Sequence, residues 1–127
     1  MATATPVLLC DLVHEDPRGH NVTLLGIFTD VRCSRFPSPS RLISAYALLD
    51  GDPGEVGEVT LACVEDATGD VQFEERQRIQ IGSNGKRHVH IRCGEGFHFP
   101  RPGFYRFMLS FDGDPIGEQT LTVQEVS

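Results

Sequence analysis

The chain has 127 residues, of which 39% are hydrophobic and 23% charged, and a formal net charge of −7. A chain of this length supplies one domain that buries about two-thirds of its unfolded surface, so a core needs neither disulfides nor a metal. The acidic balance disfavours nucleic-acid and anionic-membrane partners, because both reward basic surfaces.

The N-terminal residues carry no targeting pattern. Residues 1–6 lack lysine and arginine, and the apolar run at 7–10 is too short for the core of a secretory signal. No stretch approaches the roughly 18 apolar residues of a membrane span. We therefore expect a cytoplasmic protein.

The first forty residues predict strands separated by loops. Residues 6–12 form a short apolar run, and 14–20 form a polar loop. Residues 22–31 have apolar side chains on both faces, which predicts a central, covered strand. The two prolines within 34–40 predict an extended loop or an edge, since proline cannot donate a hydrogen bond to a strand ladder.

The middle of the chain predicts a meander of strands. Residues 42–49 are apolar on both faces and stop at Asp-Gly-Asp-Pro-Gly, so their length favours a buried strand over a helix. Residues 58–65 alternate Val, Leu and Cys on one face with Thr, Ala and Val on the other. Residues 71–81 predict a long strand with an exposed or bulged centre, and 87–93 alternate Val and Ile with His and Arg. Paired runs around turns are typical of antiparallel neighbours.

The C-terminal segment predicts a β-hairpin. Residues 104–111 place four large apolar side chains on one face, Asp112-Gly113 is a favoured two-residue turn, and 116–123 return. Tyr105 follows a Pro-Gly pair near the start of the penultimate strand, as in the tyrosine corner of β-sandwiches. Its hydroxyl is expected to bond back to the preceding connection.

These runs predict one domain over residues 1–127, an all-β, immunoglobulin-like antiparallel β-sandwich of about seven to eight strands. The chain has no Trp and lacks the Cys–Trp–Cys spacing of antibody domains. Its cysteines, Cys10, Cys33, Cys63 and Cys93, are dispersed without a CxxC pair. Small buried hydrophobes are therefore favoured over a disulfide framework.

Two motifs resemble a known family. NVTLLGIF at 21–28, followed by Phe-Pro at 36–37, forms the first, and FHFP at 97–100 with PGFYRF at 102–107 forms the second. Together they resemble a bacterial family of small, uncharacterised domains, and the likeness spans nearly the whole chain. The resemblance implies a β-sandwich fold and a bacterial source. It implies no activity and no catalytic residues.

The candidate metal site is the pattern His88-x-His90-x2-Cys93-x4-His98. His88 and His90 share one face of a strand, and imidazole and thiolate are good zinc ligands, so Cys93 and His98 could complete a tetrahedron. The spacing matches no standard zinc module, and the neighbouring basic residues oppose a cation. A solvated strand face is the plainer interpretation, and zinc binding is kept as an alternative.

Signals for catalysis are weak. The nearest nucleophile arrangement is Cys93 beside His90 or His98, without a nucleophile-elbow motif, and a buried thiol is the favoured interpretation. Basic and aromatic residues mix between 86 and 106, but the aromatics alternate as core residues do, which disfavours binding of single-stranded nucleic acid. We expect a protein without catalytic activity, and no nucleic-acid or membrane partner.

Three functions fit this sequence. The first is a non-catalytic interaction or accessory module that pairs with a protein partner, or with its own copy, through an edge strand. Residues 34–40 and 71–81 are the candidate edges. The second is a metal-binding protein that uses the His/Cys cluster, and the third is a self-assembling structural subunit. The fold alone chooses none of them.

Overall fold

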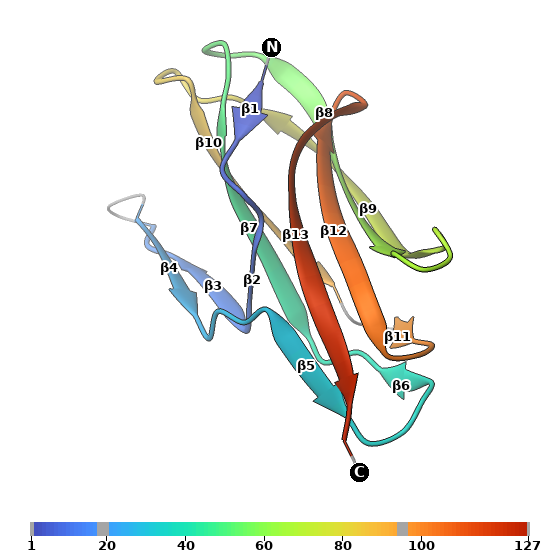
Figure 1. Cartoon of the computed structure of the whole chain (residues 1–127). Coiled ribbons are helices and arrows are strands. Elements are labelled where there is room, and N and C mark those ends of the chain that lie inside the picture. The colour runs from blue at the N-terminus through green and yellow to red at the C-terminus, as the bar shows by residue number, and fades with distance from the viewer. Residues whose placement is uncertain (1, 18–20, 94–96, 127) are drawn as a thin grey trace.

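A computed structural model describes residues 2–17, 21–93 and 97–126, which form thirteen strands and no helix (Figure 1). Thus no helix in this part of the chain is long and apolar enough to cross a membrane. The strands are β1 Thr3–Ala4, β2 Leu8–Cys10, β3 Leu12–Glu15, β4 Val22–Leu25, β5 Asp30–Cys33, β6 Ser38–Pro39, β7 Ile43–Asp50, β8 Val56–Glu65, β9 Val71–Gln80, β10 Lys86–Cys93, β11 His98–Phe99, β12 Gly103–Phe111 and β13 Asp114–Glu125.

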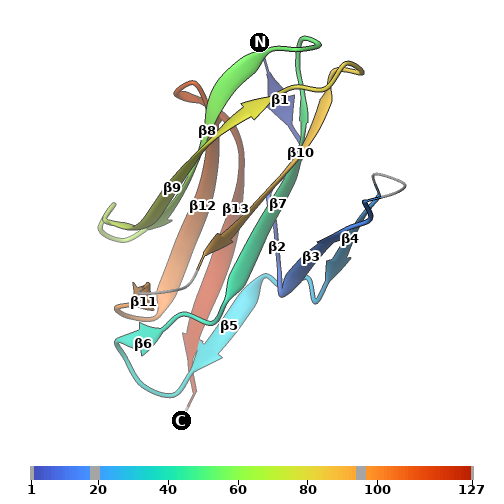
Figure 2. The ribbon, with the colours of Figure 1, turned by 180° about the vertical axis from the view of Figure 1, so that it is seen from behind.

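The strands build two main sheets that face each other (Figures 1 and 2). The larger sheet has the order β5-β13-β12-β8-β9, and the smaller has the order β1-β7-β10, with β2 also paired to β7. All pairs are antiparallel except β5 and β13, which run parallel. The prediction of an all-β, sandwich-like fold is confirmed.

The core lies between the two sheets and follows from strand alternation. In β12, the inward Tyr105, Phe107, Leu109 and Phe111 are at most 5% exposed, whereas their outward neighbours are half-buried or exposed. Fully burying one such side chain stabilises the fold by about 1.5–3 kcal/mol. The inward residues of β7 and β10 face them from the smaller sheet, and those of β8 lie beside them in the same core cluster.

Two local predictions near the hairpin are confirmed. The Tyr105 hydroxyl donates a 2.6 Å hydrogen bond to the Arg101 carbonyl, which fixes the connection that precedes β12. At the hairpin tip, Asp112 and Gly113 have φ values of 48° and 88°. Positive φ at both central residues is the type I′ geometry, which matches the twist of the flanking strands.

The prediction of one covered strand over 22–31 is wrong. Gly26 breaks it into β4 and β5 with a φ of +69°, and a Cβ at this position would lie 2.2 Å from the Asp11 carboxylate. The described residues form thirteen strands, including several short ones, rather than seven or eight. The uninterrupted apolar pattern concealed a break between two strands, because a single glycine can take a backbone conformation that other residues avoid.

Among the described residues, strands β3 and β4 pair only with each other, and they form an arm beside the smaller sheet (Figures 1 and 2). The inner face of the arm includes half-buried Val13, Val22 and Leu24. The outer face is exposed and carries Leu12 and Leu25, which lie opposite each other at 46% and 51% exposure. The arm thus adds a partial third layer over the outward face of β7 and β10.

Candidate functional site

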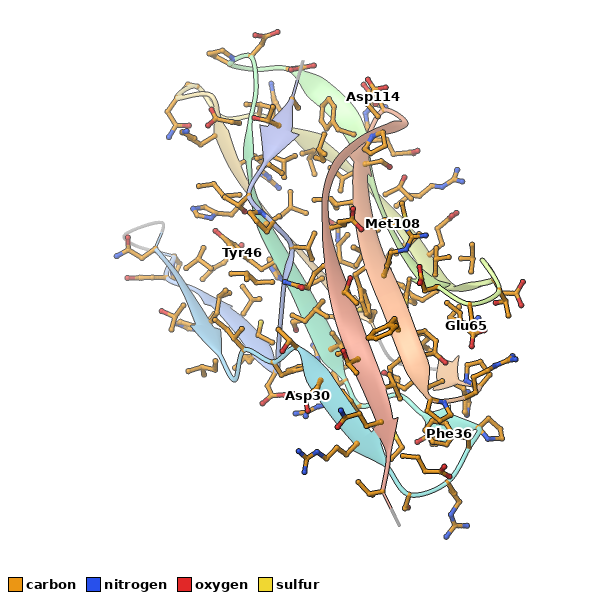
Figure 3. The ribbon with its side chains drawn as sticks, viewed as in Figure 1. Asp30, Phe36, Tyr46, Glu65, Met108 and Asp114 are labelled. Atoms are coloured by element: carbon orange, nitrogen blue, oxygen red, sulfur yellow. The ribbon has the colours of Figure 1, made fainter. Side chains whose placement is uncertain are left out.

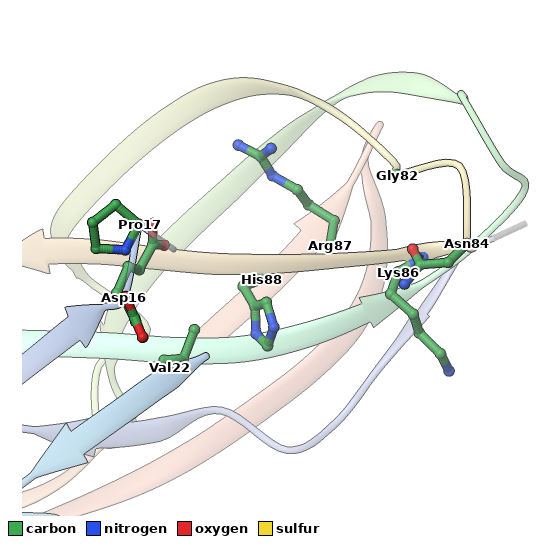
Figure 4. A pocket seen from close by; sticks show the side chains of 9 residues that line it. Asp16, Pro17, Val22, Gly82, Asn84, Lys86, Arg87 and His88 are labelled. Carbon is green, nitrogen blue, oxygen red and sulfur yellow. The ribbon is translucent and has the colours of Figure 1, made fainter. Parts of the chain in front are cut away.

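A groove of about 590 Å³ separates the arm from the smaller sheet (Figure 4). The arm contributes Glu15, Asp16, Pro17 and Val22 to its wall, and the start of β10 with the preceding turn contributes Gly82, Asn84, Lys86, Arg87 and His88. The lining is therefore mixed in charge. Residues 18–20, which join β3 to β4, lie outside the described part of the chain.

His88 lies at the groove and is held by Tyr46 on the neighbouring strand β7. The Tyr46 hydroxyl and His88 Nδ1 are 2.5 Å apart, and the two rings lie 5.7 Å apart between centroids. Figure 3 shows Tyr46 on the arm side of β7. Burial, with a smaller contribution from Glu15, raises the pKa of Tyr46, so its hydroxyl stays protonated near neutral pH.

His90 is engaged by the arm. Its Nε2 lies 3.3 Å from Glu15 Oε1, which links β10 to the tip of β3. Lys86, on the same face of β10, forms an ion pair with Asp50 of β7. Three polar side chains on this face, Lys86, His88 and His90, thus have partners within the domain.

Cys93 lies on the opposite face of β10 from His88 and His90. It is 2% exposed in the core, and its thiol donates to the Ile43 carbonyl. Burial raises the pKa of Cys93 to about 12, so the thiol is protonated and weakly nucleophilic near neutral pH. His98 lies on a different strand, β11, with an exposed side chain.

The structure therefore does not bring His88, His90, Cys93 and His98 together. Two of them share the outward face, one points inward, and one belongs to a separate two-stranded sheet. Within the described residues, no three His, Cys, Asp or Glu side chains are grouped so that they could hold a metal ion. The four cysteines are free, and Cys10, Cys63 and Cys93 are buried as small hydrophobes.

The second candidate site is the edge strand β9, which residues 71–81 predicted. It ends the larger sheet and, in the part of the chain that the structure describes, pairs with β8 alone (Figure 2). Its centre is polar, since Glu74, Glu75 and Arg76 are all exposed. The other predicted edge, residues 34–40, holds the two-residue strand β6, which pairs with β11 and belongs to neither main sheet.

The hydrogen-bond pattern of β9 follows from its neighbours. Just beyond the β8–β9 ladder, the amide of Ile81, an odd-numbered residue, donates to the Glu55 carbonyl. Bonds in antiparallel pairs recur at every second residue, so odd residues of β9 bond to β8 in the regular part of the ladder. The backbone groups of Glu74, Arg76 and Arg78 consequently point away from the sheet. This edge is an open donor and acceptor row.

The side chains of β9 are arranged by face. Phe73 and Ile79 point inward, and the Phe73 ring packs 5.9 Å from Phe97 between centroids. Glu74 and Arg76 point outward and form a 3.2 Å ion pair on the exposed surface. Charged side chains are common on exposed edge strands, because they discourage indiscriminate pairing.

One buried acid was missed from the sequence. Glu65 is 2% exposed, and it accepts hydrogen bonds from Arg101 Nε at 2.9 Å and from the Thr68 hydroxyl at 2.8 Å. Figure 3 shows Glu65 at the end of the larger sheet near the β11 connection. Its odd position in β8, in line with the inward Leu61 and Cys63, was the signal that could have found it. The Glu65–Arg101 ion pair thus stabilises the connection that precedes β12.

The aromatic residues that were considered for nucleic-acid stacking are mostly buried, and one is exposed. Phe97, Phe99 and Tyr105 are at most 3% exposed and pack edge to face or tilted against one another. Phe104 is 56% exposed. The basic and aromatic residues between 86 and 106 thus form no stacking platform in the described part of the chain.

Comparison with known structures finds distant likeness to long enzymes. A β-glucosidase of Erythrobacter marinus matches with a TM-score of 0.59 and 12% identity, over 97% of this chain and 15% of that one. A β-glucosidase involved in saponin metabolism from intestinal bacteria matches with a TM-score of 0.54 and 11% identity, over 97% and 16%. This chain spans less than one-sixth of those chains, and at such identity the likeness shows the fold alone.

A comparison with curated proteins found no match. A family model does match residues 6–124, nearly the whole chain, and it describes a family of unknown function, DUF6941. This agrees with the resemblance to an uncharacterised family. The chain belongs to the DUF6941 family.

Proposed function

We propose that this domain is a non-catalytic interaction module that joins a protein partner by strand addition at β9. The carrying observation is the ten-residue strand at the end of the larger sheet, whose outer backbone groups have no strand beside them in the described part of the chain. An extended segment that pairs here satisfies those groups and gains affinity from main-chain hydrogen bonds. The cytoplasmic, immunoglobulin-like character expected from the sequence is compatible with this role.

The other ends of the two main sheets offer less. In the larger sheet, the opposite end is the four-residue β5. In the smaller sheet, one end is shared by the two- and three-residue strands β1 and β2, and the other is the eight-residue β10, next to the arm groove. Strand β9 is thus the longest open edge among the described residues.

Side-chain charge gives this edge its selectivity. Four charged residues, Glu74, Glu75, Arg76 and Arg78, occupy consecutive or alternate positions in the centre of β9. Like charges placed opposite each other across a strand pair destabilise it, and opposite charges stabilise it. A partner strand therefore needs acidic and basic residues in matching places.

The test uses photo-crosslinking in cells from two exposed positions of the larger sheet, Arg78 on β9 and Glu118 within β13. We expect discrete crosslinked species from position 78 and none from position 118. The control is a variant that carries the crosslinker at position 78 together with Arg76→Pro. This proline removes an outward amide without touching the β8 ladder, and proline is tolerated on open edges.

The expected loss of crosslinks with Arg76→Pro would tie them to strand addition. Equal crosslinking from positions 78 and 118, or crosslinking that survives Arg76→Pro, would contradict the proposal.

A further inference from the structure

The residues on the two sides of Arg76, in β9 and at the position just after it, match in polar or apolar class, and one mirrored pair, Glu74 and Arg78, has opposite charges. Moving outward from this residue, Glu75 mirrors Gln77, Glu74 mirrors Arg78, Phe73 mirrors Ile79, Gln72 mirrors Gln80 and Val71 mirrors Ile81. We propose that the partner of β9 is a second copy of this chain, paired antiparallel about a two-fold axis through Arg76. This inference rests on the proposed strand addition and names its partner.

The backbone permits this pairing. A two-fold axis perpendicular to the sheet brings each residue opposite one of the same face, so Glu74 meets Arg78 and Phe73 meets Ile79 of the second copy. The outward backbone groups of Glu74, Arg76 and Arg78 then bond to each other across the axis. Two five-stranded sheets become one continuous sheet, and neither copy of β9 remains an open edge.

The side chains match in this register. On the outward face, Glu74 lies opposite Arg78 of the second copy, twice by symmetry, and opposite charges in such pairs stabilise a sheet. On the inward face, Phe73 lies opposite Ile79, an aromatic pair with a β-branched residue, which is also favourable. The irregularity in the β8–β9 ladder lies between Phe73 and Val71, so it falls outside the central seven residues.

Neighbouring registers match less well. An axis through Glu75 also pairs Glu74 with Arg76 twice, but it places two acids opposite each other and sets Phe73 against Gln77, so the pair of Phe73 with Ile79 is lost. An axis through Gln77 sets Arg76 against Arg78 twice, and an axis through Glu74 sets that acid against itself. The axis through Arg76 leaves one like-charged pair, and there each Arg76 has Glu74 of its own chain 3.2 Å away.

A contact of one strand pair is small, so the dimer is weak and depends on concentration. Sedimentation equilibrium from about 1 μM to about 500 μM covers the range in which such a dimer forms. We expect the average mass to rise toward two chains. Strictly monomeric protein over this range would overturn the inference.

Disulfide trapping determines the register. Residues opposite each other in a hydrogen-bonded pair lie about 5.5 Å apart between Cα atoms, within disulfide reach. In a Cys33→Ser background, which removes the one cysteine that is not fully buried, Arg76→Cys is expected to give a covalent dimer under mild oxidation. Glu118→Cys serves as the exposed control. Trapping at Glu75→Cys in place of Arg76→Cys would overturn the register.

Charge exchange tests the pairing chemistry. Glu74→Lys and Arg78→Glu each place like charges opposite one another twice, and each is expected to weaken the dimer at least about tenfold. The double variant restores opposite charges and is expected to recover the wild-type dissociation constant within about threefold. Additive weakening in the double variant would overturn the pairing.

The experiments distinguish failure of strand addition at β9 from failure of self-pairing. If position 78 crosslinks to a different protein and the purified chain stays monomeric, strand addition stands and the self-pairing is wrong. If β9 crosslinks to nothing and the chain stays monomeric, both are wrong.

Discussion

The outward face of the smaller sheet and the free edge of the larger one both carry polar and charged side chains, but they are satisfied differently. Tyr46 bonds to His88, and Glu15 pairs with His90, so both histidines of the first surface have partners within the domain. Strand β9 keeps a row of backbone donors and acceptors that no strand of the described residues covers. Side-chain chemistry drew attention to the first surface, whereas sheet order identifies the second as the one that needs a partner.

The largest expected loss of stability comes from Gln77→Pro, and proline at the neighbouring position 76 is the comparison that sharpens this contrast. Gln77 bonds to β8 and Arg76 points outward, by the alternation of the ladder. We expect Gln77→Pro to lower the free energy of unfolding by about 3 kcal/mol, because it breaks the ladder and leaves a carbonyl of β8 without its donor. Arg76→Pro is expected to cost less than about 1 kcal/mol. Urea denaturation checks both, and equal losses would contradict the assigned direction of the backbone groups.

The base of the arm provides the next effect. Gly26→Ala forces a side chain into positive φ and against Asp11, whose carboxylate pairs with Arg41. We expect a loss of about 2 kcal/mol, from the backbone penalty and the disturbed ion pair. Thermal unfolding measures it. If Gly26→Ala leaves the stability unchanged, the connection between the arm and the sandwich does not depend on the positive φ of Gly26.

The Tyr46–His88 contact is expected to matter less. Tyr46→Phe removes one side-chain hydrogen bond at a half-buried position, which costs about 1 kcal/mol. Since both histidines of this face have partners within the domain, dimer formation through β9 should not change. Denaturation and sedimentation of the same variant check both statements, and a weakened dimer would link the two surfaces.

The buried thiols provide the smallest effect near neutral pH. Burial raises the pKa of Cys93 from 9.0 to about 12 and also raises that of Cys63. A group with a raised pKa in the folded state holds its proton longer than in the unfolded state, so its contribution is complete below pH 9 and is lost as the pH rises toward 12. The free energy of unfolding should therefore decrease above about pH 9. Cys93→Ala and Cys63→Ala should flatten this slope, and an unchanged slope would assign it to other groups.

Sequence patterns predicted the regular parts of the fold well. Period-two alternation located β12 and the inward residues of β10, and turn chemistry located the Asp112-Gly113 hairpin. The break at Gly26 was missed, because apolar residues on both sides hid a position that requires positive φ. Local pattern does not record which strands become edges, since that depends on pairing between distant segments.

The candidate metal ligands show the same limit. His88 and His90 do share a face, as alternation predicts, but Cys93 has the opposite parity and points into the core. Parity in one strand was readable from the sequence, whereas the placement of His98 on a separate strand was not. Likewise, the symmetry of β9 is present in the sequence, and its meaning depends on the sheet order that leaves this strand at an edge.

Amide hydrogen exchange along β9, resolved by residue at low and high protein concentration, tests the central claim most directly. Odd residues such as Glu75 and Gln77 should be protected at both concentrations, because they bond to β8. Even residues such as Glu74, Arg76 and Arg78 should exchange freely in dilute protein and become protected as the second copy binds. Protection of the even residues at every concentration would show that the edge is already covered. No protection at any concentration would show that β9 does not pair with its own copy.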